Sequence, residues 1–365
     1  MAASWAASRG SVVPCPELVY AVLIAGAGPA AAAGAIALAG QGVGPIAIAG
    51  PSHPAPAFGE TPFFSETPLF SETLPGAARI MLHELGVWQA FAADRHPPSL
   101  GSVSQWGSDR VEVRDGLTDP QGSGWRLDRD RFERMLLNEA ARRGVTVLPT
   151  RAVGIQGEAG DWRVQLQPGG EVRCRTVVDA AGRRAPIARR LGIGKSRLDR
   201  LTAHITSSPA AVSRWDGFSQ VRALETGWAY ATRLPNGSRL HALFTDADLP
   251  APGGRALRRA AWTGRLGQFA GPGWAAVGDA ACCFDPLSSQ GLFHALYGGL
   301  RLGCAVAEGR LHVYADEIES VWVAYERHHR AYYGAERRWP AAAFWKRRSP
   351  GSGHGSDCKS HPLHV

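Results

Sequence analysis

The chain has 365 residues, of which 45% are hydrophobic and 20% are charged, a balance typical of folded proteins and too apolar for a disordered one. This length predicts about two domains. Arginine carries almost all of the net charge of +8, but no basic run is interleaved with stacking aromatic residues, so we expect no nucleic-acid partner.

The N-terminal segment predicts a strand, a helix and a second strand. Residues 20–25 and 45–49 are short apolar runs typical of buried strands, and residues 29–40 between them predict a helix. The stretch 18–59 carries no charge, as a membrane-spanning helix would. Each of its glycines would cost such a helix about 1 kcal/mol, so we expect no membrane partner. Residues 1–19 lack the pattern of a signal peptide and predict a flexible tail.

A short repeat and two helices follow. Residues 59–76 read GETPFFSETPLFSETLPG, three similar hexapeptides that predict an irregular loop. Apolar residues at helical spacing predict helices over 77–91 and 129–143. The runs DWRVQLQP (161–168) and EVRCRTVVDAAG (171–182) predict strands.

From residue 201 the pattern changes to alternating strands, which indicates a second, sheet-based unit. GWAYATRLP (227–235) and RLHALFTD (239–246) are its clearest members. The run GWAAVGD (273–279) returns to a buried strand, and 316–348 predicts a long helix broken near Pro340. The tail from 349 to 365 is rich in Gly, Ser and His and predicts flexibility.

Cysteine usage indicates neither a zinc site nor a disulfide framework. The six cysteines show no C-x-x-C spacing and no histidine cluster at ligand distance. We therefore expect a reduced, cytoplasmic protein without a metal. The cysteines are Cys15, Cys174, Cys282, Cys283, Cys304 and Cys358.

GAGPAA at 26–31 follows the first strand and opens the first helix, which is the setting that a dinucleotide fingerprint requires. Gly26 permits the tight turn, Gly28 lets a pyrophosphate approach the backbone, and Ala31 replaces the third glycine. Ala30 and Ala31 begin the helix whose N-terminus binds the phosphate charge. The alternative is a plain Gly/Ala-rich turn. The acid expected at the end of the second strand, to bind a ribose hydroxyl, is Ala49.

Four motifs in order carry a resemblance to a known family. After GAGPAA come GWRLDRDRFERML, VVDAAGRRAPIARRLG and GDAACCFDPLSSQGLFHALYGG. Together they resemble FAD-dependent monooxygenases and halogenases of the p-hydroxybenzoate hydroxylase type, over about residues 20–347. The chain looks most like the tryptophan-halogenase-like flavoproteins, including those that hydroxylate a protein tryptophan during maturation of quinone cofactors.

The resemblance implies an α/β fold, with a Rossmann-like FAD-binding domain, an inserted mostly β substrate domain and a C-terminal helix. The FAD-binding domain would be discontinuous. The expected bounds are 20–58, 125–192 and 270–308 for the FAD-binding domain, 59–124 and 193–269 for the substrate domain, and 309–348 for the C-terminal helical segment.

The resemblance also assigns the GD pair and the loop after it to the flavin. Asp279, next to Gly278, would bind the ribityl chain. Backbone N–H groups and the dipole of the following helix would then stabilise negative charge on the reduced ring. The loop and helix residues concerned are Pro286, Ser289, Gln290, Gly291 and Leu292. The plain alternative is a helix cap and turn.

Three further residues are site candidates by resemblance. Arg129 would contact the phosphate or ribose side of FAD, or is a surface arginine. Trp228 and Tyr230 lie two apart on one strand and so share a face, where they would meet an aromatic substrate or pack in the core. Asp246 and Asp248 suit either acid/base chemistry or a strand-end turn. His204, His241 and His294 are isolated, and we assign no catalytic base.

Two departures from the family bear on the reaction. Halogenases of this group resemble one another in a lysine soon after the helix that follows the G-E-[ST] loop, and this chain has no lysine before Lys195. The span between Leu249 and Gly273 looks shorter than in relatives, which implies a shortened wall of the substrate pocket. No second G-x-G-x-x-G is present, so NAD(P)H or a flavin reductase would supply electrons from outside.

The resemblance thus implies a flavin monooxygenase that hydroxylates an electron-rich aromatic through a C4a-hydroperoxyflavin. The aromatic substrate is either free or bound to a peptide or carrier. A flavin-dependent halogenase is the alternative within the family, disfavoured by the missing lysine. A catalytically degenerate flavin-binding scaffold is the alternative of another class.

Overall fold

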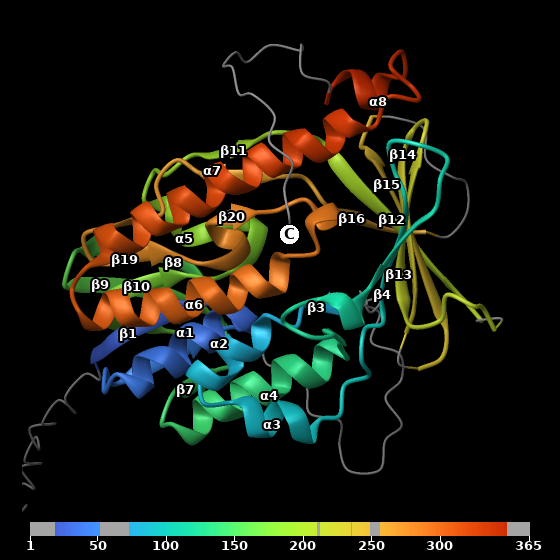
Figure 1. Ribbon diagram of the computed structural model, residues 1–365. Helices are drawn as coiled ribbons and strands as arrows, with labels where there is room; N and C mark the ends of the chain where they lie inside the picture. The colour runs from blue at the N-terminus through green and yellow to red at the C-terminus, as the bar shows by residue number, and fades with distance from the viewer. Residues whose placement is uncertain (1–18, 52–72, 210–211, 235, 249–255, 349–365) are drawn as a thin grey trace, which may run out of the picture.

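The computed structural model describes residues 19–51, 73–209, 212–234, 236–248 and 256–348. A largely parallel sheet occupies one half of the molecule, and a mostly antiparallel sheet stands beside it at the right of Figure 1. The expected α/β class with a separate β unit is confirmed.

The parallel sheet has the strand order β18-β19-β10-β1-β2-β7, with β8 and β9 attached antiparallel at β10. Central β1 is buried on both sides, since Leu23 and Ile24 are fully covered. A strand covered on both faces needs a continuous apolar run, which is why VYAVLIA forms it. The strands are β1 (Val19–Ala25), β2 (Ile46–Ala49), β7 (Thr146–Leu148), β8 (Arg151–Glu158), β9 (Asp161–Gln167), β10 (Glu171–Asp179), β18 (Ala270–Gly271) and β19 (Trp274–Ala276).

Helices cover this sheet. The central helix α1 (Pro29–Gly40) packs against α6 (Gly291–Ala307) and α4 (Arg129–Arg142). The carboxylate of Asp128 caps α4 by accepting from the backbone N–H of Arg131 at 3.1 Å. The single helix expected over 77–91 is instead two, α2 (Ala78–Glu84) and α3 (Trp88–Ala93). Gly86 separates them at φ +65, a conformation that ends a helix and that glycine adopts readily. A short α5 (Pro186–Arg190) follows β10.

The second sheet has the order β16-β12-β15-β14-β13-β4-β5. Its pairs are antiparallel except β13 with β4, which run parallel. The strands are β4 (Gly101–Gln105), β5 (Glu112–Asp115), β12 (Leu201–Ser208), β13 (Phe218–Leu224), β14 (Gly227–Arg233), β15 (Arg239–Asp246) and β16 (Leu257–Ala260).

The two faces of this sheet differ. One face carries Trp228, Phe244 and Ala203, which are buried against Phe344 and Trp345 of the C-terminal segment. This face is turned toward the parallel sheet, and we call it the inner face (Figure 1). The opposite, outer face carries exposed side chains such as His241 and Arg222. Register fixes the assignment, since Trp228 pairs with Phe244 whereas His241 pairs with Ala231.

The C-terminal helix joins the two halves. α7 (Leu311–Ala335) runs along the first half and ends beside the second sheet, where the short α8 (Ala343–Lys346) covers its inner face. The helix expected over 316–348 thus ends at Ala335, ahead of Pro340. No helix in the described part of the chain has the length and apolarity to cross a bilayer. Residues 59–72 of the repeated loop, residues 1–18 of the expected tail 1–19, and the expected tail 349–365 lie outside the described residues, and Val19 begins β1.

Candidate functional site

The turn between β1 and α1 is built from two glycines with different tasks. Gly26 has φ +124, and a Cβ there would lie 2.2 Å from the carbonyl oxygen of Ala180, so the fold itself requires this glycine. Gly28 has an ordinary φ of −79 and is the N-cap of α1. A Cβ on Gly28 would meet nothing within 4 Å. The fold therefore does not need Gly28, and the space beside it is open to a ligand.

The GD turn packs on the start of α1. Gly278 has φ +61, and a Cβ there would come within 2.7 Å of the Cβ of Ala30. Asp279 follows in a short 3-10 helix (η3, Gly278–Ala280), and its carboxylate is 39% exposed. Arg183 Nε lies 3.2 Å from that carboxylate. The turn thus brings Asp279 to the edge of the sheet where α1 begins.

Sequence reasoning missed the cations at this turn. Besides Arg183, Lys195 Nζ donates to the carbonyl oxygens of Asp279 at 2.6 Å and of Ala280 at 3.0 Å. Both basic side chains lie near the indole ring of Trp262. Lys195 is on β11 (Lys195–Arg197), which joins β17 (Gly264–Leu266) and β20 (Cys282–Cys283) in a small sheet behind the turn. Its ammonium group therefore holds the turn in place.

The loop DPLSSQG leads into α6. The Asp285 carboxylate accepts from the N–H of Leu287 at 2.8 Å and caps the 3-10 turn η4 (Pro286–Ser288). Ser289 then takes the left-handed conformation at φ +51, which is unusual for a residue with a side chain. Gln290 is the N-cap of α6, and a Cβ on Gly291 would meet nothing within 4 Å. The N-terminus of α6 is therefore open, as that of α1 is.

α6 runs parallel to α1 at close approach. A Cβ on Gly299 would lie 2.7 Å from the Cβ of Ala33, and one on Gly303 would lie 2.4 Å from the Cβ of Ala37. Because both contacts advance by four residues in the same direction, the two helix N-termini point to the same edge of the sheet. Helix N-termini attract anions through unpaired N–H groups and the helix dipole.

These features fit a dinucleotide cofactor. Two open helix N-termini, the glycine turn and a half-exposed carboxylate lie together, as an extended anionic ligand with hydroxyl groups requires. Ala30, Ala31 and Leu292 are buried, so they would offer backbone N–H groups only. Ala49 at the end of β2 is 1% exposed, and it offers no carboxylate to a ribose.

Arg129 is the first residue of α4, and its guanidinium pairs with Glu133 one turn later. This is the helix-surface pairing that the sequence also allowed. Its contact with the cofactor stays a prediction.

Trp228 and Tyr230 both stand on the inner face, at different depths. Trp228 is 1% exposed, stacks on Phe244 at 3.8 Å and donates its indole N–H to the Tyr333 hydroxyl at 3.0 Å. Its ring thus packs in the core of this sheet. Tyr230 is half-buried, and its hydroxyl lies 3.3 Å from the Ser219 hydroxyl.

The hydroxyl contact of Tyr230 with Ser219 extends to a third hydroxyl group, that of Thr73. Ser219 Oγ lies 3.3 Å from the hydroxyl of Thr73, in the short strand β3 (Thr73–Leu74) that pairs with β6 (Trp125–Arg126). Three hydroxyl groups from distant segments therefore form one chain on the inner face. Such a chain can orient a polar group of a substrate.

A buried polar network lies behind the DPLSSQG loop, and sequence reasoning missed it. The Asp285 carboxylate is 1% exposed and accepts from the Tyr333 hydroxyl at 2.8 Å. His329 Nε2 lies 3.3 Å from the same oxygen, and the Tyr325 hydroxyl accepts from the N–H of Asp285 at 2.8 Å. Burial alone would raise the pKa of Asp285, but His329 and the other donors hold it below its ordinary value.

This network fixes the loop to α7 and, through Tyr333 and Trp228, to the second sheet. Asp199 also lies close by, and burial together with the Asp285 charge raises its pKa. The only hint in the sequence was the Asp-Pro turn, which predicts a cap and not its partners some forty residues further on.

None of the three isolated histidines is placed as a catalytic base. His294 lies in α6, 4.3 Å from the Phe284 ring, and burial lowers its pKa to about 4. His204 and His241 stand on the outer face, where burial and neighbouring arginines lower the pKa of each. Asp246 and Asp248 are taken up by ion pairs with Arg347.

Comparison with known proteins agrees with this geometry. The family model described as tryptophan halogenase matches residues 108–352. The putative FAD-dependent oxidoreductase LodB of Marinomonas mediterranea is 25% identical over 289 residues, which are 69% of this chain and 78% of LodB. The flavin-dependent halogenase armH2 of Armillaria mellea is 22% identical over 284 residues, 58% of this chain and 52% of armH2.

Two solved structures share the fold. The myxobacterial chondrochloren halogenase CndH superposes with a TM-score of 0.75 at 19% identity, over 92% of this chain and 86% of CndH. The peptidyl tryptophan dihydroxylase QhpG superposes with a TM-score of 0.71 at 24% identity, over 91% of this chain and 79% of QhpG. The expected resemblance is confirmed, and the chain belongs to the tryptophan halogenase family of FAD-dependent oxidoreductases.

Proposed function

We propose that the chain is a monooxygenase that hydroxylates an electron-rich aromatic ring carried by a peptide or another macromolecule. The observation that carries the proposal is the pair of parallel helices, α1 and α6, whose open N-termini meet Asp279 at one edge of the sheet. The similarity to LodB and to QhpG, which acts on peptidyl tryptophan by its name, supports it.

The residues have the following roles in this proposal. The N–H groups at Gly28 and the start of α1 bind the pyrophosphate, and Asp279 binds the ribityl hydroxyls. The N–H groups at the start of α6, from Gly291 on, would donate hydrogen bonds to the reduced flavin ring and stabilise its negative charge. We also propose that residues 20–58, 125–192 and 270–308 form the FAD-binding domain and that 59–124 and 193–269 form the substrate domain.

Bound FAD supplies the redox chemistry, taking two electrons from NAD(P)H or a flavin reductase and activating O2. One oxygen atom then enters the ring as a hydroxyl group, and the other leaves as water with the displaced proton and one from solvent. Tyr230, backed by Ser219 and Thr73, orients the ring on the inner face. Leu287, which packs against the same face, helps to exclude water.

Halogenation is disfavoured by the position of the lysines. The sequence has none before Lys195, and the Lys195 ammonium is occupied by the carbonyl oxygens of Asp279 and Ala280. The alternative of a catalytically degenerate scaffold predicts a protein that binds FAD but forms no product. FAD content and product formation are therefore measured separately.

The first test is FAD content after purification, from the visible absorbance of bound flavin. Gly28→Val places a side chain in the open space, so we expect the variant to fold and to lose most of its FAD. Gly40→Val is the matched control, because a Cβ on Gly40, at the other end of α1, also meets nothing within 4 Å. Asp279→Ala should weaken FAD binding more mildly. Full FAD content in both Gly28→Val and Asp279→Ala would refute the site.

The second test is the product. With NAD(P)H, a flavin reductase and isotopically heavy O2, we expect a tryptophan- or tyrosine-containing peptide to gain heavy oxygen, and no halogen isotope pattern with chloride or bromide present. A halogenated product would overturn the hydroxylase assignment while leaving the FAD site intact.

A further inference from the structure

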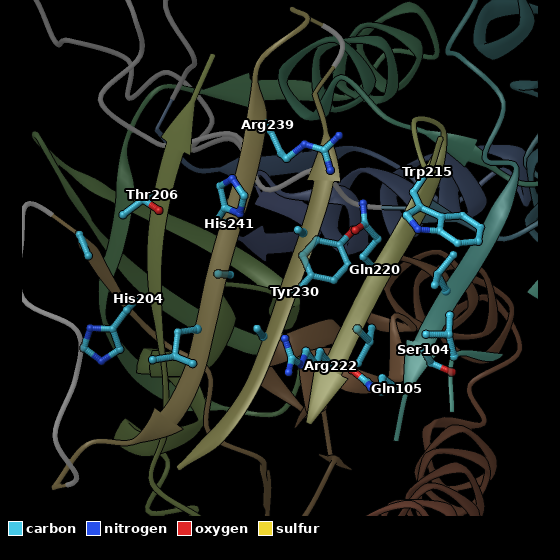
Figure 2. A pocket seen from close by; sticks show the side chains of 18 residues that line it. Ser104, Gln105, His204, Thr206, Trp215, Gln220, Arg222, Tyr230, Arg239 and His241 are labelled. Carbon is cyan, nitrogen blue, oxygen red and sulfur yellow. The ribbon is translucent and has the colours of Figure 1, made fainter. Parts of the chain in front are cut away.

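An open cavity lies on the outer face of the second sheet (Figure 2). Its volume is about 590 Å³, within the range of specific ligand sites. Its lining side chains come mainly from β12, β15, β14, β13 and β4. By register most of them face away from Trp228, whereas Ser104, Val221, Tyr230 and Ala242 belong to strand positions of the inner face.

The floor of this cavity is apolar, and two arginines, Arg222 and Arg239, stand at its rim. Ala229, Ala231 and Leu243 form the floor, with Val103 buried beside them. Around them stand Arg222, Arg239, His204, His241, Gln220 and Trp215 (Figure 2). Among the described residues, no aspartate or glutamate lines the cavity.

Two donors in the cavity lack an acceptor. The Gln220 Nε2 group is buried and has no hydrogen-bond partner in the described part of the chain, which is costly unless a ligand supplies one. The Arg222 side chain is exposed, and no ion pair to it is found among the described residues. The single carboxylate of Asp216 accepts from both Arg239 and Arg233, so it neutralises only part of their combined positive charge. The cavity therefore offers N–H groups and positive charge to an acceptor-rich, anionic ligand.

The shape favours a polypeptide segment over a small metabolite. Small molecules are usually enclosed over most of their surface, whereas Thr206, Arg222 and His241 at this rim are exposed. We propose that the outer face is a docking surface for an acidic segment of a protein partner that carries an aromatic or aliphatic side chain. The carboxylates meet Arg222 and Gln220, and the apolar side chain lies on the Ala229–Leu243 floor beside Trp215.

This inference is independent of catalysis, because the docking surface is on the face opposite the proposed flavin. Its failure would leave the proposed function standing, and loss of FAD binding would leave the docking surface standing. The basic, arginine-rich composition of the chain acquires a specific role if the surface binds as proposed.

The test is a fluorescence-anisotropy titration of the purified full chain with a labelled peptide that alternates glutamate and leucine and contains one tryptophan. We expect Arg222→Glu to weaken binding about tenfold or more, since it replaces attraction by repulsion. Arg151→Glu is the matched control: it makes the same charge change at an exposed residue of β8, and should change binding less than about twofold.

A second variant keeps charge constant. Gln220→Met preserves the side-chain volume and removes the unpaired donor, so it should weaken binding of the peptide without lowering the melting temperature. The same peptide with glutamine in place of glutamate should not bind. Equal losses from Arg222→Glu and Arg151→Glu would show attraction by net charge alone and overturn the proposal. Tighter binding of a single-stranded oligonucleotide at the same surface would overturn it in favour of a nucleic-acid site.

Discussion

At the residue scale, His294 in α6 shows how burial of a histidine creates a pH dependence of stability. Its ring lies against Phe284, and Nε2 is 3.1 Å from Oε1 of Gln290. Burial lowers its pKa from 6.5 to about 4. Above the unfolded pKa both states are neutral and the histidine has no effect. As the pH falls below it, the unfolded state takes up a proton first, so the free energy of unfolding decreases until the folded pKa is reached.

We therefore expect acidification from about pH 7 to about pH 5 to cost about 2 kcal/mol of stability through this residue. His294→Phe should remove that loss while keeping the ring packing. Urea unfolding of both proteins at the two pH values measures it. His312→Phe, at an exposed position of α7, should retain the wild-type pH dependence. If His294→Phe loses as much stability on acidification as the wild type, the histidine is not buried in its neutral form.

At the element scale, the register of α1 against α6 sets where the two helix N-termini lie. A Cβ on Gly299 would meet the backbone nitrogen of Gly34 at 2.7 Å and the carbonyl oxygen of Ala30 at 2.9 Å. Backbone atoms cannot move aside as a flexible side chain can, so the helices must separate. We expect Gly299→Ala to lower the free energy of unfolding by about 1–3 kcal/mol.

The matched control for this prediction is Gly40→Ala, where a Cβ meets nothing within 4 Å and helix propensity favours alanine by up to about 1 kcal/mol. Both are measured by urea unfolding, with FAD content as a second readout. Gly299→Ala should also lose FAD, because the N-termini of α1 and α6 no longer share their geometry. A Gly299→Ala protein as stable as Gly40→Ala would contradict the close packing.

Elements whose pattern is local were predictable from the sequence. α1 spans 29–40 as expected, β15 spans 239–246, and α4 lies within one residue of its expected end. Their apolar periodicity and caps are contained in the segment itself. The short strands β16, β17, β18 and β20 were not predicted, because two to four residues carry no period and form strands only through their neighbours.

The candidate site was predictable only in part, for the same reason. The glycine turn and the GD and DPLSSQG segments are visible as motifs. The alternation of side chains along a strand predicts that Trp228 and Tyr230 share a face. How deeply each side chain is buried depends on α7 and α8, which cover Trp228 and leave Tyr230 half-buried. Likewise, only the folded chain distinguishes Gly26, which the fold requires, from Gly28, which it does not.

At the scale of the whole molecule, the C-terminal segment, residues 343–348, packs on the second sheet and fixes it to the rest of the chain. Phe344 and Trp345 of α8 are buried against the inner face, and the Trp345 indole N–H donates to the carbonyl oxygen of Leu224 at 2.8 Å. Arg348 lies 3.8 Å above the Phe344 ring and pairs with Asp246 at 2.7 Å. The C-terminal segment is therefore held by apolar burial and by one deeply buried ion pair.

Arg347 and Arg348 both form ion pairs with the carboxylate of Asp246, which is 2% exposed. Arg348 is 6% exposed and Arg347, 2.9 Å away from the same carboxylate, is 43% exposed. Removing one partner of a buried pair leaves a charge without compensation and costs about 3–5 kcal/mol, although Arg347 can offset part of this here. An exposed pair contributes less than about 1 kcal/mol. We therefore expect Arg348→Met to lower the free energy of unfolding by about 3 kcal/mol and Arg347→Met by less than about 1 kcal/mol, in urea titrations followed by tryptophan fluorescence. Equal losses in the two variants would mean that exposure does not govern the strength of the two ion pairs, and no loss in either would mean that Phe344 and Trp345 alone hold the C-terminal segment.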